Sequence, residues 1–299
     1  MGTSRRDFLK IVTAGTLVAT GVKNAAATPV NILSDDRMGV LVDATACIGC
    51  RQCEYACKEE HGLPTGNLED YADRSVFEHE RRPDVDALTV VNQYPNVHKD
   101  EPPVTLKVQC MHCDHPACVS ACIVGAFSKQ ENGAVIWDES RCIGCRYCMV
   151  ACPFQIPAFE YNKAIEPRIM KCDLCYDNRT SKGLPPACVE ACPTEALTFG
   201  KRYELVKLAH DKIDNEPDRY FDHVYGEHEV GGTSWLYISG QDFSTLHFPK
   251  LGDEPIPGAT EPIQHAIFKF FVPPVALYAL LGGIMWLGKN KEESEEEEE

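Results

Sequence analysis

The stretch that decides the fold is Cys142-Ile143-Gly144-Cys145-Arg146-Tyr147-Cys148-Met149-Val150-Ala151-Cys152-Pro153. Its four cysteines are separated by two, two and three residues, and a proline follows the last of them. The chain has 16 cysteines in 299 residues, and each belongs to one of four groups of four, of which the second and fourth have a longer middle spacer. The other three groups are Cys47, Cys50, Cys53, Cys57; Cys110, Cys113, Cys118, Cys122; and Cys172, Cys175, Cys188, Cys192. The cysteines therefore form a repeated kind of site.

This spacing indicates iron-sulfur chemistry. In a C-x2-C-x2-C-x3-C-P run, three thiolates hold one 4Fe-4S cluster and the fourth ligates a neighbouring cluster. Four groups predict four 4Fe-4S clusters as cofactors. A disulfide framework would not explain the repeated spacing, and a chain of 299 residues can build a core without such staples. Structural zinc uses paired C-x2-C hooks, which only the fourth group, taken alone, would satisfy.

The sequences that flank the cysteines show an internal repeat. A short strand and an aspartate, Val40 to Asp43 and Val135 to Asp138, precede the first and third groups. The second and fourth groups share a Pro-Ala-Cys turn and a following strand. The second and third groups, joined by the turn 131–133, form one two-cluster ferredoxin, and the outer groups close a second one around it. The predicted fold class is α+β: two interlocked bacterial-type two-cluster ferredoxin-like domains with insertions.

Crossed ligation then assigns the cysteines to clusters, because the fourth cysteine of each group serves the neighbouring site. The predicted sets are Cys47/Cys50/Cys53/Cys192, Cys172/Cys175/Cys188/Cys57, Cys110/Cys113/Cys118/Cys152 and Cys142/Cys145/Cys148/Cys122. A lysine buried near such a cluster would raise its potential, and Lys58 is one candidate, although a solvated side chain is the expected state of a lysine.

The two ends of the chain carry targeting signals. The run Ser4-Arg5-Arg6-Asp7-Phe8-Leu9-Lys10 matches the twin-arginine export signal, and Ala25-Ala26-Ala27 offers a cleavage site. An uncharged stretch, Phe270 to Leu287, is just long enough to predict one C-terminal transmembrane helix, with Lys289 and Lys291 favouring a cytoplasmic tail. The predicted localisation is the periplasmic face of the cytoplasmic membrane.

These features give a domain plan. It comprises a signal peptide (1–27), the interlocked cluster domain (37–203) with an insertion (58–109), a C-terminal extension (204–265), a transmembrane anchor (266–288) and an acidic tail (289–299). The net charge of −16 argues against a nucleic-acid partner. No nucleophile motif, phosphate loop or Rossmann fingerprint is present. We therefore expect no catalytic residues and a role in electron relay.

The four groups and the long fourth spacer resemble the iron-sulfur beta subunits of membrane-associated molybdopterin oxidoreductases and some hydrogenases. The twin-arginine start, the stretch 225–233 and Gln264-His265 before the apolar segment are similar to the HybA-type subunit of nickel-iron hydrogenases. This resemblance implies hydrogenase small and large subunits and a HybB/NrfD-like, quinone-interacting integral membrane subunit as partners. The alternative is a subunit of a molybdenum or tungsten enzyme that acts on polysulfide, thiosulfate or formate.

Overall fold

The computed structural model describes residues 37–163, 165–258, 260–261 and 275–286. The chain divides into two compact units, of which Leu33–Pro257 contains all sixteen cysteines. The other unit comprises 1–32 and 258–299, and its described part includes a helix over 275–286. The predicted twin-arginine signal and acidic tail lie outside the described residues.

The main sheet joins segments from both ends of the larger unit. Its strand order is β8-β1-β9. β1 (Met38–Asp43) pairs antiparallel with β8 (Leu197–Lys201) and parallel with β9 (Trp235–Ile238). β1 and β9 are almost wholly buried apolar strands, as expected of strands covered on both faces. The sheet thus ties the strand before the first cysteine group to the strand that follows the fourth.

The predicted central hairpin is confirmed. β4 (Phe127–Lys129) pairs with β5 (Val135–Trp137), and Gly133 in the turn has a φ of 94°, which favours glycine. Two further antiparallel pairs are β2 (Val90–Tyr94) with β3 (Val104–Val108) and β6 (Ala158–Phe159) with β7 (Ile169–Met170).

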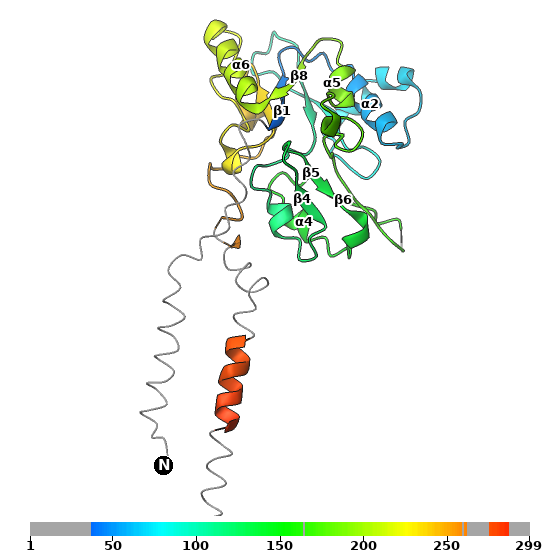
Figure 1. Cartoon of the computed structure of the whole chain (residues 1–299). Helices are drawn as coiled ribbons and strands as arrows, with labels where there is room; N and C mark the ends of the chain where they lie inside the picture. Colours follow the sequence, from blue (N-terminus) through cyan, green and yellow to red (C-terminus); the bar gives the residue numbers. More distant parts are fainter. Residues whose placement is uncertain (1–36, 164, 259, 262–274, 287–299) are drawn as a thin grey trace, which may run out of the picture. The chain divides into compact units, whose positions relative to one another are not determined.

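The cysteine-bearing helices pack in two pairs. α2 (Gln52–Glu60) of the first group contacts α5 (Ala187–Glu190) of the fourth. α3 (Ala117–Ser120) of the second group contacts α4 (Tyr147–Ala151) of the third. Figure 1 shows α2, α5, β1 and β8 gathered in one part of this unit, and α4, β4 and β5 in another. The outer cysteine groups therefore share one ferredoxin-like module, and the inner groups share a second.

The segments outside these modules cover them. α6 (Arg202–Asn215) packs on β1 and β8 through Leu205, Ala209 and Ile213. Short 3-10 helices complete the described part of the unit: η1 (Leu68–Ala72), η2 (Ser75–Glu78), η3 (Glu139–Arg141), η4 (Thr180–Lys182), η5 (Glu229–Gly231) and η6 (Phe243–Leu246). β9 and η6 contribute Trp235, Tyr237 and Leu246 to the core around the first and fourth cysteine groups.

The insertion 58–109 is held by a buried carboxylate on α2. Glu54, 2% exposed, accepts hydrogen bonds from the backbone N–H of Val91 at 2.6 Å and from Arg51 at 3.2 Å. Arg81 in the insertion also donates to Glu54. This network fixes β2 and the loop before it against the first cysteine group.

The predicted fold class is wrong in including a transmembrane helix, and the predicted membrane-anchored localisation is wrong for the same reason. Among the described residues, no helix is long and apolar enough to cross a membrane. The helix over 275–286 would rise about 18 Å, against about 30 Å of hydrocarbon in a bilayer. The remainder of the predicted anchor lies outside the described residues. The described chain is a mixed α/β ferredoxin-like structure.

Candidate metal centres

The first two cysteines of every group lie in a C-x2-C loop, and the four loops share one backbone feature. In each loop the residue before the second cysteine has a positive φ: Gly49 at 70°, His112 at 49°, Gly144 at 68° and Leu174 at 63°. Two of these residues carry side chains, so the conformation costs of order 1–3 kcal/mol at each. Such strain persists where the surroundings over-determine the backbone, as at functional sites.

This conformation turns backbone amides toward sulfur. The N–H of Gly144 donates to Sγ of Cys142 at 3.5 Å, and that of Leu174 donates to Sγ of Cys172 at 3.4 Å. Hydrogen bonds from fixed backbone amides stabilise thiolates and tune the potential of a bound cluster. The loops are therefore suited to hold anionic sulfur ligands.

The inner groups bring their thiols together across group boundaries. Burial and then the neighbouring thiols of Cys145, Cys122 and Cys142 raise the pKa of Cys148 to about 12. Burial likewise raises the pKa of Cys113 well above its usual value, and the thiols that contribute are Cys110, Cys118 and Cys152. In both cases a cysteine of the other group joins three from one group.

The outer groups behave in the same way. Burial raises the pKa of Cys47, and Cys192 of the fourth group adds to this shift together with Cys50. Burial and then the thiols of Cys172, Cys188 and Cys175 raise the pKa of Cys57 well above its usual value. For these two thiols, the neighbouring cysteines are those of the predicted crossed sets, which stay a prediction.

A cavity supports the fit of one cluster. It is lined by the four thiols of the first predicted set, with Gly49, Thr194 and Lys107. All sixteen cysteines are free; three of this cavity come from the first group, and Cys192 comes from the distant fourth group. This arrangement matches the donor set of a 4Fe-4S site, in which three thiolates of one run are joined by a fourth from elsewhere in the chain.

His112 offers a second test of fit. Its side chain is fully buried, and Nδ1 accepts a hydrogen bond from the backbone N–H of Val135 at 2.8 Å. The neutral ring must then carry its proton on Nε2, which has no partner among the described residues. Burial holds the pKa of His112 well below its usual value, so the ring is neutral at pH 7. A buried N–H donor without an acceptor fits beside the sulfur atoms of a cluster.

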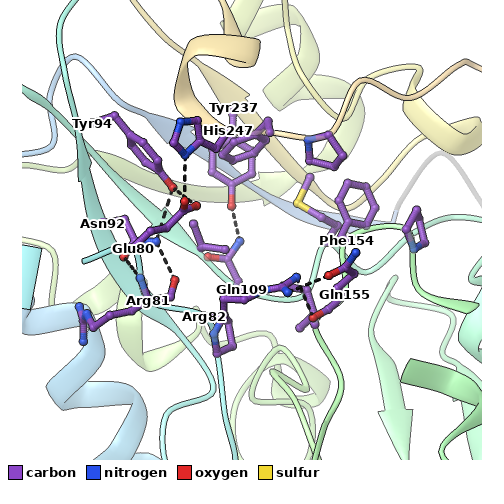
Figure 2. Close-up of a pocket in the computed structure, with 17 residues that line it drawn as sticks. Glu80, Arg81, Arg82, Asn92, Tyr94, Gln109, Phe154, Gln155, Tyr237 and His247 are labelled. Carbon is purple, nitrogen blue, oxygen red and sulfur yellow. Dashed lines mark hydrogen bonds and ion pairs between the residues drawn. The ribbon is translucent and has the colours of Figure 1, made fainter. Parts of the chain in front are cut away.

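Residues that flank Cys110 and Cys152 in the sequence line a second cavity (Figure 2). They are Gln109 and Met111 on either side of Cys110, and Pro153 and Phe154 after Cys152. Figure 2 shows the hydroxyl of Tyr237 directed at the side chain of Gln109, which donates a hydrogen bond to it. The walls are closed by pairs of charged and polar side chains: Arg82 with Gln155, and His247 with Glu80.

The sequence did not reveal the buried lysines of the site. Lys107 and Lys171 are 2% and 6% exposed, and Lys129 is also shielded from solvent. Each interacts electrostatically with cysteines of the predicted sets. Lys58, the lysine singled out from the sequence, is half-buried. In the sequence, only the short separations of Lys107 from Cys110 and of Lys171 from Cys172 pointed to these lysines. Such separations do not predict burial, because neighbouring positions in a strand or loop differ in burial.

Thiol sets of this kind on a ferredoxin-like fold are typical of an iron-sulfur electron carrier. A family model of the 4Fe-4S dicluster domain matches residues 104–202. The Hydrogenase-2 operon protein HybA of Escherichia coli O157:H7 is 33% identical, over 92% of this chain and 93% of its own length. The nitrate-inducible formate dehydrogenase iron-sulfur subunit of Escherichia coli is 34% identical, over 87% and 88%. A protein of Nitratidesulfovibrio vulgaris is 51% identical, over 80% of this chain and 65% of that one.

The chain therefore belongs to the family of iron-sulfur subunits that includes these hydrogenase and formate dehydrogenase proteins. It is an electron-transfer iron-sulfur subunit, and the HybA-type resemblance predicted from the sequence is confirmed.

Proposed function

We propose that the chain binds four 4Fe-4S clusters through the four crossed cysteine sets and relays electrons between a nickel-iron hydrogenase dimer and a quinone-interacting integral membrane subunit. When bound, the clusters supply one-electron transfer. The chain's own residues hold them in order, shield them from water and set their electrostatic surroundings.

The observation that carries this proposal is the arrangement of the thiols. Electrostatic interactions link the sets in series: Cys188 interacts with Cys53, Cys110 with Cys172, and Cys148 with Cys118. These three links support the order first, second, third and fourth as given above. A linear series suits a relay, because an electron that enters at one end leaves at the other.

Exposure at the two ends of the series supports this interpretation. At one end, Cys145 is exposed beside the exposed apolar side chains of Ile143, Tyr147 and Val150. At the other end, Ile48 in the first C-x2-C loop is 57% exposed. Between them, the second set contains Cys57, Cys172, Cys175 and Cys188, all buried. Terminal sites that reach the surface can exchange electrons with partner subunits.

The partners follow from the relatives. HybA is named for hydrogenase-2, and that protein matches nearly the whole length of this chain, which favours hydrogenase small and large subunits. The formate dehydrogenase subunit matches to a similar extent, which supports a molybdopterin oxidoreductase as the alternative.

Metal analysis of the complex that co-purifies anaerobically with this chain tests the proposal. The four clusters of this chain alone contribute about 16 iron atoms, so at least that many per copy of the chain are expected in the complex, with nickel in the hydrogenase case. Molybdenum or tungsten in place of nickel would identify the partner as the alternative, a molybdopterin oxidoreductase, and would leave the electron relay itself unchanged. Zinc without iron would refute the relay.

Crossed ligation is tested by replacing the fourth cysteine of the outer groups. In Cys192→Ser we expect a changed spectrum for the cluster that Cys47→Ser also affects, and in Cys57→Ser for the cluster that Cys172→Ser affects. Electron paramagnetic resonance of the reduced variants provides the measurement. If Cys192→Ser altered the same cluster as Cys172→Ser, the crossed sets would be wrong.

A further inference from the structure

Strand β3 carries a lysine in the interior of the protein. Lys107 is 2% exposed, and its Nζ donates to Oε1 of Gln109 at 2.9 Å. The same atom lies 4.4 Å from the ring centroid of Trp235. Within the described part of the chain, no carboxylate forms an ion pair with this ammonium group. A buried cation with only neutral partners is costly, so a negative group is required nearby.

The groups that supply this negative charge are cysteines of two sets. Lys107 interacts electrostatically with Cys53 of the first set and with Cys57, Cys172 and Cys188 of the second. It also lines the cavity formed by the four thiols of the first set. The ammonium group therefore lies between the two outer cysteine sets, where thiolates bound to iron would serve as its counter-charge.

Its neighbours hold it in this position. Gln109, which accepts from Lys107, donates in turn to the hydroxyl of Tyr237, as Figure 2 shows. That hydroxyl donates to the backbone carbonyl of Lys107 at 3.1 Å, and Tyr237 is fully buried. The ring of Trp235 stabilises the cation from one side. The position of the ammonium charge is thus fixed, and the charge is shielded from solvent and salt ions.

We propose that Lys107 is a fixed positive charge that raises the reduction potentials of the two outer clusters. This inference rests on the proposed function, because it requires clusters in the outer sets. Reduction adds a negative charge, and a nearby buried cation stabilises the reduced form more strongly than the oxidised form. Lys107 acts through the clusters' surroundings and does not ligate iron.

Redox titration of the full-length chain, followed by electron paramagnetic resonance under anaerobic conditions, tests the proposal. In Lys107→Gln, two of the four potentials are expected to fall. Each should shift the ratio of reduced to oxidised cluster at a given potential at least tenfold, which is about 59 mV for one electron. Lys107→Arg keeps the charge and should restore both potentials. Lys207→Gln on α6 removes an exposed charge and should leave all four unchanged.

The outcomes separate the inference from the proposed function. Fewer than four clusters in the unmodified chain would refute the proposed function. Four clusters whose potentials are all unchanged in Lys107→Gln would refute the inference alone. If Lys107→Gln does not fold, Gln109→Glu decides, since it places a carboxylate against Nζ and offsets its charge. Both outer potentials should then fall, and a shift only in the set containing the adjacent Cys110 would overturn the inference.

Discussion

Removing the charge of Glu54 should cost more stability than any exposed ion pair of the chain. Glu54 is buried, and it accepts from Arg51, from Arg81 and from the N–H of Val91. In Glu54→Gln the amide can still accept from Val91, but two guanidinium groups lose their counter-charge. Breaking a buried pair by removing one partner costs about 3–5 kcal/mol. The side chain of Arg81 is 26% exposed and can reach water, so we expect the lower end, about 3 kcal/mol.

The assay is thermal unfolding of the cluster-loaded chain under anaerobic conditions at one scan rate. For a unit of the size of Leu33–Pro257, about 3 kcal/mol corresponds to a fall in Tm of about 6–12 °C. The matched control is Glu216→Gln, which breaks the exposed pair with Arg219. Such a pair contributes about 0–1 kcal/mol, so the fall should not exceed about 4 °C. Equal iron content must be verified first. A fall for Glu54→Gln no larger than that of the control would refute the reasoning.

Two further perturbations have predictable signs. Gly226→Ala should lower Tm by several degrees, because φ is 94° and the new Cβ would overlap Oγ1 of Thr233. Gly252→Ala, with open space and ordinary φ, is the control, and equal Tm values would contradict this account. Burial lowers the pKa of His61, but the hydrogen bond and charge of Asp173, together with the carbonyl of Cys57 and the charge of Glu60, outweigh this and leave the pKa raised. Its contribution to stability is therefore fully present below about pH 6.5 and lost as pH rises through the folded pKa, so the Tm difference between wild type and His61→Gln should shrink from pH 6 to pH 9. A Tm difference that grows with pH would contradict this prediction.

The cysteine repeat allowed the ferredoxin-like modules to be predicted, because each module is built from local spacing and a short turn. The hairpin of β4 and β5 follows from the turn residues at 131–133, and the crossed sets follow from the ligation rule. The strand β9 could not be predicted in this way. Its four residues pair with β1 from almost 200 positions along the chain, and no repeat marks them. The hairpin of β2 and β3 was missed for the same reason, since the insertion has no counterpart in the inner module.

The burial of Lys107 was the other feature that could not be predicted from the sequence. A lysine in a strand is expected on its exposed face, and nothing local to Lys107 marks that strand as covered on both sides. Its burial depends on Trp235 and Tyr237, which the distant β9 supplies. The C-terminal transmembrane helix was also predicted wrongly. That prediction was based on the length of the uncharged stretch, whereas the described helix covers only 275–286.

The pairing of β1 with β8 also determines the order in which parts of the chain can fold during synthesis. During synthesis, the inner module has all of its cysteines and the hairpin of β4 and β5 once residue 152 has emerged, and its remaining strands, β6 and β7, follow soon after, so its contacts are short in sequence. β1 emerges early but must wait for Leu197–Lys201, and then for β9, before its edges are satisfied. Contacts of such long separation form slowly and leave an apolar strand exposed in the interval. The nascent chain is therefore expected to load iron from the middle outward, and to need protection of its first strand until translation is nearly finished.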